Sequence, residues 1–154
     1  MKGRMIKSSV TKNVFALIAI SALIGYVTLL LSQTVFCRSS QYNYSHYLMP
    51  FWSYQAILDG YYLIIIDILL NLAMFIPVGL LLRLGIKSIN CRGVLLVCLL
   101  VSVSIEFLQF ALNRGSAEFD DVMHNLLGGL FGYELYYLIK SGYEKFLNRR
   151  MAVL

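Results

Sequence analysis

The chain has 154 residues, of which 59% are hydrophobic and 14% are charged, and its mean hydropathy is +0.72. This composition excludes an ordinary soluble domain and predicts an integral membrane protein. The formal net charge is +5, but no basic stripe with stacking aromatic side chains accompanies it in a soluble module, which argues against nucleic-acid binding.

Four long apolar segments predict four membrane-spanning helices. They cover residues 14–31, 63–82, 94–112 and 122–139, and each is close to the roughly 20 residues that cross a hydrocarbon core about 30 Å thick. We therefore expect an all-α integral membrane bundle of four transmembrane helices, forming a single domain over residues 1–154. No clear small-residue cleavage site precedes Cys37, so the first segment is interpreted as an uncleaved signal anchor.

The basic residues predict the orientation of this multi-pass protein. If the N-terminus is cytoplasmic, all Lys and Arg residues except Arg38 and Arg114 fall in the inner segments. Because Lys and Arg near span ends are retained on the cytoplasmic side, we expect both termini to face the cytoplasm.

The segment between the first two spans, residues 33–62, is rich in aromatic side chains. These are Tyr42, Tyr44, His46, Tyr47, Phe51, Trp52, Tyr54, Tyr61 and Tyr62. Aromatic rings with a polar tip favour the membrane-water interface, so this loop is expected on the outer surface of the bilayer. Pro50 interrupts any longer helix and leaves residues 51–58 as a short interfacial helix. Interfacial anchoring and a lid over the bundle both remain open as roles.

Polar side chains within or at the rim of the apolar segments form the candidate functional site. They are Asp67 and Asn71 in the second segment, Glu106 and Gln109 in the third, and Asp120, Asp121, His124 and Asn125 in the fourth. Such residues are costly in a membrane and indicate function by default. With a rise of about 1.5 Å per residue, they lie at similar depths near the outer ends of their helices. We expect them to share a cavity that opens outward.

The residue types suggest two kinds of chemistry. Glu106, the deepest on its helix, is our candidate general acid or base, with Asp121 as its partner, because neighbouring buried carboxyls separate their pKa values. Arg114 is placed at the mouth, where it could bind phosphate or carboxylate. The candidate ligand-binding residues are Arg114, Gln109, Asp67, Asn71, Asn125, Asp120 and His124.

Several of these assignments have plainer alternatives. Asp120 and Asp121 open the fourth helix and could serve only as its cap. His124 could transfer protons, but a lone His without a second His or Cys nearby argues against zinc, and we predict neither a metal nor a cofactor. Gly128 and Gly132 have the GxxxG spacing of a helix-packing face, which could lie within the chain or support a homo-oligomer.

Four sequence motifs together resemble the VanZ-like family of small bacterial membrane proteins. They are LMPFWS at 48–53, NLAMFIPVGLLL at 71–82, SIEFLQF at 104–110 and RGSAEFDDVMHNLLGGLFGY at 114–133. The resemblance implies a bacterial cell-membrane protein of a family named for a protein that confers low-level resistance to teicoplanin, a glycopeptide antibiotic. Its motif positions here are Asn71, Pro77, Gly79, Glu106, Gln109, Arg114, Asp121, Asn125 and Gly128.

Three functional hypotheses follow. The first is a cell-envelope protein whose outward cavity binds an amphiphilic or lipid-linked ligand. The second is a membrane enzyme that uses the Glu106 and Asp121 carboxyls on an envelope lipid intermediate. The third is a structural or partner protein in which the polar residues only hold helices together.

Overall fold

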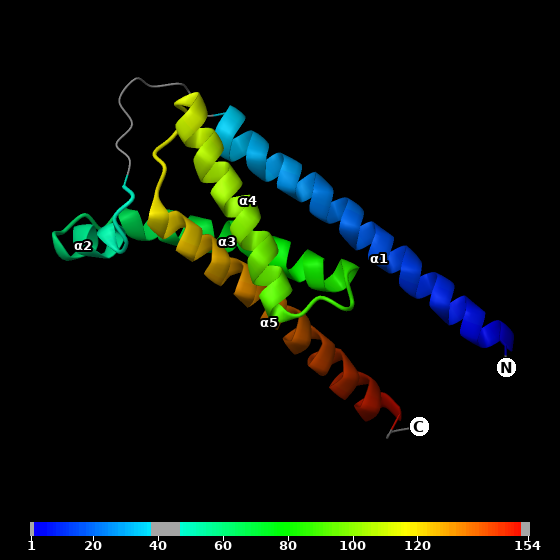
Figure 1. The fold of residues 1–154 in the computed structure, drawn as a ribbon. Coiled ribbons are helices and arrows are strands. Elements are labelled where there is room, and N and C mark those ends of the chain that lie inside the picture. The colour runs from blue at the N-terminus through cyan, green and yellow to red at the C-terminus, as the bar shows by residue number, and fades with distance from the viewer. Residues whose placement is uncertain (1, 38–46, 152–154) are drawn as a thin grey trace.

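The computed structural model describes residues 2–37 and 47–151, and these residues are almost entirely helical (Figure 1). The elements are α1 (Lys2–Leu31), a π-helical turn η1 (Ser32–Phe36), α2 (Trp52–Leu58), α3 (Ile64–Gly85), α4 (Cys91–Leu112) and α5 (Phe119–Met151). The described residues contain no strand, only an isolated bridge between Tyr47 and Glu118. The all-α prediction is confirmed.

Three helices in the described part of the chain are long and apolar enough to cross a membrane. They cover Asn13–Phe36, Ile64–Gly85 and Cys91–Leu112, which agrees with the first three predicted spans. The fourth predicted span, residues 122–139, lies inside α5 but is not among them. His124, Asn125 and Glu134 lie within this segment and lower its mean hydropathy, so a fourth span, and with it a cytoplasmic C-terminus, stays a prediction.

The centre of the fold is the crossing of α3 with α5, where the two backbones meet through glycine. A Cβ atom at Gly128 would overlap the carbonyl oxygen of Leu72, and one at Gly132 would overlap that of Ile76. The GxxxG face is therefore occupied by α3 of the same chain. This contact is within one chain and gives no support for a homo-oligomer, so self-association through these two glycines stays a prediction.

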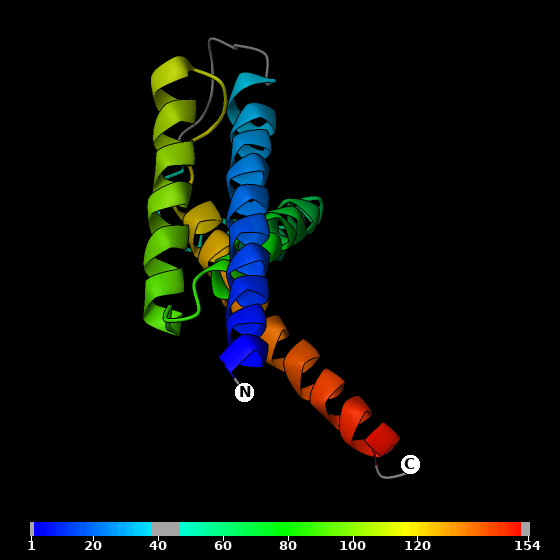
Figure 2. The same ribbon diagram turned by 90° about the vertical axis from the view of Figure 1, so that its right-hand side faces the viewer.

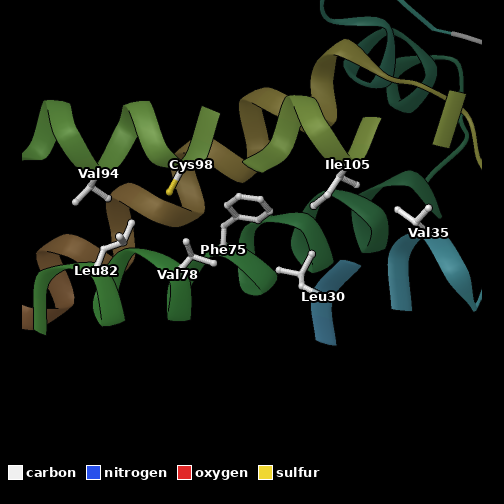
Figure 3. Close-up of a cluster of buried hydrophobic side chains, with 8 residues drawn as sticks. All are labelled: Leu30, Val35, Phe75, Val78, Leu82, Val94, Cys98 and Ile105. Carbon is white, nitrogen blue, oxygen red and sulfur yellow. The ribbon is translucent and has the colours of Figure 1, made fainter. Parts of the chain in front are cut away.

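The remaining helices pack around this crossing: α1 packs on α3, and α4 packs on α5. Figure 3 shows the buried apolar cluster, in which Phe75 and Val78 of α3 face Cys98 and Ile105 of α4. In Figure 2, α1 and α4 run upright while α5 crosses obliquely and its last turns extend beyond the other helices. Those last turns are exposed.

The two ends of the bundle differ in character. At one end, the Arg83 side chain donates through Nε to the Tyr137 hydroxyl at 3.1 Å, which ties α3 to α5. The other end collects η1, α2, the first turns of α3 and α5, and the last turns of α4 (Figure 1). We call it the polar end, because most of the predicted site residues lie there.

The aromatic segment is attached to the polar end through its backbone. The Tyr47 amide donates to the Ala117 carbonyl, and the Phe119 amide donates to the Tyr47 carbonyl, both at 3.1 Å. The predicted short helix over residues 51–58 is confirmed as α2. Tyr42, Tyr44 and His46 of the predicted aromatic loop, together with Arg38, lie outside the described residues.

Candidate functional site

A cavity of about 390 Å³ opens at the polar end, and we call it the polar cavity. Its lining comes from η1, α2, α3, α5 and the turn before α5: Gln33, Thr34, Trp52, Ser53, Ile64, Asp67, Ile68, Leu70, Asn71, Met74, Ser116, Glu118 and Asp121. Among the described residues of this lining, three have carboxyl side chains and none is Lys or Arg. The cavity therefore combines an acidic polar wall with apolar walls.

Three of the predicted site residues meet in this cavity. Asp67 and Asn71 are four residues apart, so they project from the same face of α3 into it. Asp121 reaches it from the first turn of α5. Two helices far apart in sequence thus bring these three polar side chains into one cavity.

Glu106 lies elsewhere. It is 9% exposed, and its Oε2 accepts a hydrogen bond from the Glu118 amide at 2.9 Å, which holds the turn between α4 and α5. Its side chain lines a second, largely apolar groove of about 360 Å³, between α4 and the start of α5, to which Asp121 does not contribute. Among the cavities described here, the predicted acid-base pair is divided, since Glu106 lines this groove and Asp121 lines the polar cavity.

Gln109 and Arg114 hold the end of α4 against η1. The Gln109 side chain is buried and donates through Nε2 to the Thr34 carbonyl at 3.0 Å. Arg114 donates through Nη1 to the Phe36 carbonyl at 2.7 Å. Neither is among the described residues that line the polar cavity, and an anion site at Arg114 stays a prediction.

Asp120 caps a helix, but the helix is α2 and not its own. Its carboxylate accepts hydrogen bonds from the Phe51 amide at 2.6 Å, the Ser53 amide at 3.0 Å and the Ser53 hydroxyl at 2.5 Å. Phe51 is the N-cap of α2 and has a left-handed backbone with φ of 66°. Because Asp120 is only 2% exposed, this contact is a buried joint between α5 and α2.

His124 supports the same joint one turn further along α5. Its Nε2 lies 3.0 Å from the Tyr54 hydroxyl of α2. Its Nδ1 has no hydrogen-bond partner among the described residues. Within the same residues, no group of three His, Cys, Asp or Glu side chains is placed to hold a metal ion, and the cysteines Cys37, Cys91 and Cys98 are free.

Asn125 joins α5 to α4 inside the bundle. Its Nδ2 donates to the Ser102 hydroxyl at 2.8 Å, and both side chains are buried.

We expect Ser102→Ala to lower the free energy of unfolding by about 0.6–2 kcal/mol, because it removes the acceptor of a buried interhelical bond. Thermal unfolding in detergent checks this. The control is Ser104→Ala, which removes only an exposed bond within α4; an equal loss there would contradict the assignment.

Several residues that line the polar cavity were not predicted from the sequence. Ser53 and Glu118 belong to segments that were interpreted as an aromatic loop and a turn, and Thr34 lies in η1, for which no sequence pattern was recognised. Only Ser53 had a usable signal, since it ends the LMPFWS motif.

Comparison with known proteins places the chain among VanZ-like sequences. Residues 15–140 match a family model described as VanZ/LLP1. The chain is similar to protein VanZ of Enterococcus faecium, with 36% identity over 66 residues, which is 43% of this chain and 41% of that protein. The matched region is thus less than half of either protein. No solved structure matches the chain significantly.

Proposed function

Because the chain belongs to the VanZ/LLP1 family, we propose that it is a bacterial cell-envelope protein that binds an amphiphilic ligand in the polar cavity and lowers susceptibility to teicoplanin. The link to teicoplanin comes from the family. The ligand-binding part has its main support in the polar cavity, whose lining includes the ends of two helices apolar enough to cross a membrane, Asn13–Phe36 and Ile64–Gly85. With the orientation that the basic residues predict, this cavity opens to the outer side.

The cavity has the composition of a binding site for a molecule that is part polar and part apolar. Its volume of about 390 Å³ falls in the range of roughly 300–1,000 Å³ that is usual for small-molecule sites. Ser53, Asn71 and Ser116 offer groups that donate and accept hydrogen bonds, and Ile64, Ile68 and Met74 supply apolar wall. In such sites a few placed polar groups orient a ligand that is held mainly by apolar contact.

The test removes carboxylates from the cavity without changing side-chain size. In a host that lacks the protein, the wild-type chain should raise the teicoplanin concentration needed to stop growth. The double variant Asp67→Asn with Asp121→Asn should bring that concentration back to within about twofold of the empty vector, since it removes two of the three carboxylates that line the cavity. Membrane levels measured by immunoblot should be unchanged.

The control is Asp59→Asn, an exposed carboxylate at the end of α2 that does not line the cavity. It should protect as well as the wild type. If the cavity variant protects equally well at equal membrane levels, the polar cavity is not the functional site.

The enzyme hypothesis has less support from the geometry, since its two carboxyls line different cavities. It remains a separate prediction with its own measurement. Mass spectrometry of envelope lipids with and without the protein would reveal a changed product if Glu106 or Asp121 acted on an envelope lipid.

A further inference from the structure

The last turns of α5 extend past the end of α3. Near that end, the Arg83 side chain is hydrogen-bonded to Tyr137 of α5, and α3 stops at Gly85 whereas α5 continues to Met151. Figures 1 and 2 both show these turns leaving the bundle on the side away from the polar end. We call residues 139–151 the terminal segment, and all of them are exposed.

One side of the terminal segment is apolar and continues the side of α5 that contacts α3. Ile139, Tyr143 and Phe146 are four and three residues apart, so they share one side of the helix. Ile139 follows Gly132 by seven residues, which is close to two turns, so this is also the side on which Gly132 meets the α3 backbone. Beyond the end of α3, Ile139, Tyr143 and Phe146 are 56, 62 and 52% exposed. The packing face of α5 therefore continues past the helix that covers it.

Basic side chains surround this apolar face. At about 100° per residue, Lys140 and Arg149 lie on its two sides and Arg150 lies within it. The Arg150 guanidinium carbon is 5.2 Å from the centre of the Phe146 ring, so a cation and an apolar ring occupy the same side of the helix. The terminal segment has four Lys and Arg residues and one carboxylate, Glu144. That carboxylate is 4.0 Å from the Lys140 ammonium, and both side chains are exposed, so the pair contributes little.

We propose that the terminal segment lies on the bilayer surface at this end of the bundle and binds the head groups of anionic phospholipids. Its apolar face enters the boundary between head groups and acyl chains, and Lys140, Arg149 and Arg150 contact the lipid phosphates. Helices that combine an apolar face with Lys and Arg bind membrane surfaces in this way. The distribution of basic residues predicts that this end is cytoplasmic, where anionic lipids give the leaflet a negative surface potential.

The geometry of α5 allows this placement. In Figure 2, α5 crosses obliquely beside the upright α1 and α4, so its end leaves the bundle at an incline to them. Ser141 and Gly142 lie at the start of the terminal segment, and a Gly/Ser pair is a common place for a helix to bend. Among the described residues, an added Cβ at Gly142 would meet nothing within 4 Å, so packing does not require the glycine. A bend there would bring the apolar face onto the bilayer.

A second copy of the chain is the main alternative partner for this face. Pairing two such faces would bring Lys140, Arg149 and Arg150 of one copy close to the same residues of the other. Like charges at an interface repel each other, whereas an anionic surface attracts all three side chains. The charges of the terminal segment therefore favour a lipid surface over self-association.

Hydrogen exchange of the full chain in nanodiscs tests the proposal. One set of nanodiscs contains phosphatidylcholine alone, and the other contains equal parts of phosphatidylcholine and phosphatidylglycerol. We expect the amides of residues 143–151 to exchange about tenfold more slowly with phosphatidylglycerol, because binding protects the last turns from opening. Amides at the crossing of α3 with α5 should exchange equally in both lipids. High salt should remove most of the difference, since it screens the charges.

A charge variant tests the basic side chains. Arg149→Gln with Arg150→Gln should reduce the effect of phosphatidylglycerol to about twofold. The matched control is Lys87→Gln with Arg92→Gln, which removes the same charge from exposed positions at the connection between α3 and α4. This control should keep the full effect. If it loses the effect as the Arg149 and Arg150 variant does, the terminal segment is not the lipid-binding element.

A second variant tests the apolar face. Phe146→Ala should speed exchange of residues 143–151 in phosphatidylglycerol nanodiscs about threefold or more, because it removes most of a buried ring. Alanine favours the helix more than phenylalanine does, so faster exchange would not come from a weaker helix. Asn148→Ala is the control, because Asn148 lies on the opposite side of α5. It should exchange no faster than the wild type.

Three other results would overturn the proposal. Equally fast exchange in both lipids would show that the terminal segment stays in solution. Equally slow exchange in both lipids would show that something other than an anionic surface covers it, and a disulfide between two copies carrying Tyr143→Cys would identify a second copy as the cover. Normal exchange in Phe146→Ala would show that the apolar face does not enter the bilayer.

Discussion

Replacing Gly132 with alanine should prevent the chain from folding stably, although the same replacement at Gly142 in the same helix should be harmless. A new Cβ at position 132 would overlap the backbone carbonyl oxygen of Ile76 and come close to the amide of Leu80. Backbone atoms cannot rotate away as a side chain can. Helices α3 and α5 would have to separate along their crossing, which is the most extensive contact in the fold.

The size of the effect follows from two opposing terms. Alanine is favoured over glycine inside a helix by about 1 kcal/mol. Overpacking a tight contact costs about 1–3 kcal/mol and sometimes more. Because both partners at this contact are backbone, we expect the upper end, a net loss of about 2 kcal/mol or more for Gly132→Ala. A new Cβ at Gly142 would have nothing within 4 Å. Gly142→Ala should therefore show only the stabilising effect of the higher helix propensity of alanine.

Thermal unfolding in detergent, followed by the fraction of monodisperse protein, measures both variants. Gly132→Ala should unfold well below the wild type or fail to be recovered, while Gly142→Ala should unfold at the wild-type temperature or slightly above. Gly128→Ala, which would overlap the carbonyl oxygen of Leu72, should behave like Gly132→Ala. A Gly132→Ala protein as stable as the wild type would show that α3 and α5 do not cross as described.

The helices themselves could be predicted because long apolar runs carry a strong signal. The first three spans agree with Asn13–Phe36, Ile64–Gly85 and Cys91–Leu112 to within a few residues. The spacing of Gly128 and Gly132 likewise predicted a packing face. It could not identify the partner, because any helix with a smooth surface fits such a face, and only the folded chain shows that α3 fills it.

The site was harder to predict because periodicity gives the face of a helix and not its neighbour. Asp67 and Asn71 do share a cavity with Asp121. Glu106 has the same kind of signal, a carboxyl in an apolar helix, yet it accepts a backbone hydrogen bond from Glu118 and lines another groove. The difference depends on where the turn before α5 lies relative to α4. The path of a turn cannot be predicted from sequence periodicity.

The acidic pair Asp120 and Asp121 illustrates the same limit. Two adjacent residues in a helix project about 100° apart, so they must meet different surroundings. Asp121 lines the polar cavity, whereas Asp120 is buried against α2. Sequence alone suggested that either could cap the helix they open. The residues that Asp120 caps, Phe51 and Ser53, are 69 and 67 positions earlier in the chain, and no local pattern could reveal this.

Asp120→Ala should therefore release α2 from the bundle while the α3 and α5 crossing stays intact. The change removes the acceptor of three hydrogen bonds, from the Phe51 amide, the Ser53 amide and the Ser53 hydroxyl. Bonds to a charged group contribute about 1.5–3 kcal/mol each, but contributions of neighbouring bonds do not add. The left-handed backbone of Phe51, with φ of 66°, stores about 1–3 kcal/mol that would no longer be offset. Together, these two effects should lower the stability of the docked α2 by about 3 kcal/mol.

Hydrogen exchange measured over residues 47–60 detects this change directly. A loss of about 3 kcal/mol in local stability corresponds to more than a hundredfold faster exchange of the α2 amides, whereas amides of α3 and α5 beyond their first turns should exchange as in the wild type. Asp59→Ala is the control, because the Asp59 carboxylate accepts only an exposed hydrogen bond from Gln55.

Asp120→Ala should also remove teicoplanin protection, since Trp52 and Ser53 of α2 form part of the polar cavity wall. Unlike Gly132→Ala, it should not lower the unfolding temperature. An α2 that exchanges slowly in Asp120→Ala would mean that packing of the aromatic side chains, and not this carboxylate, holds the wall in place.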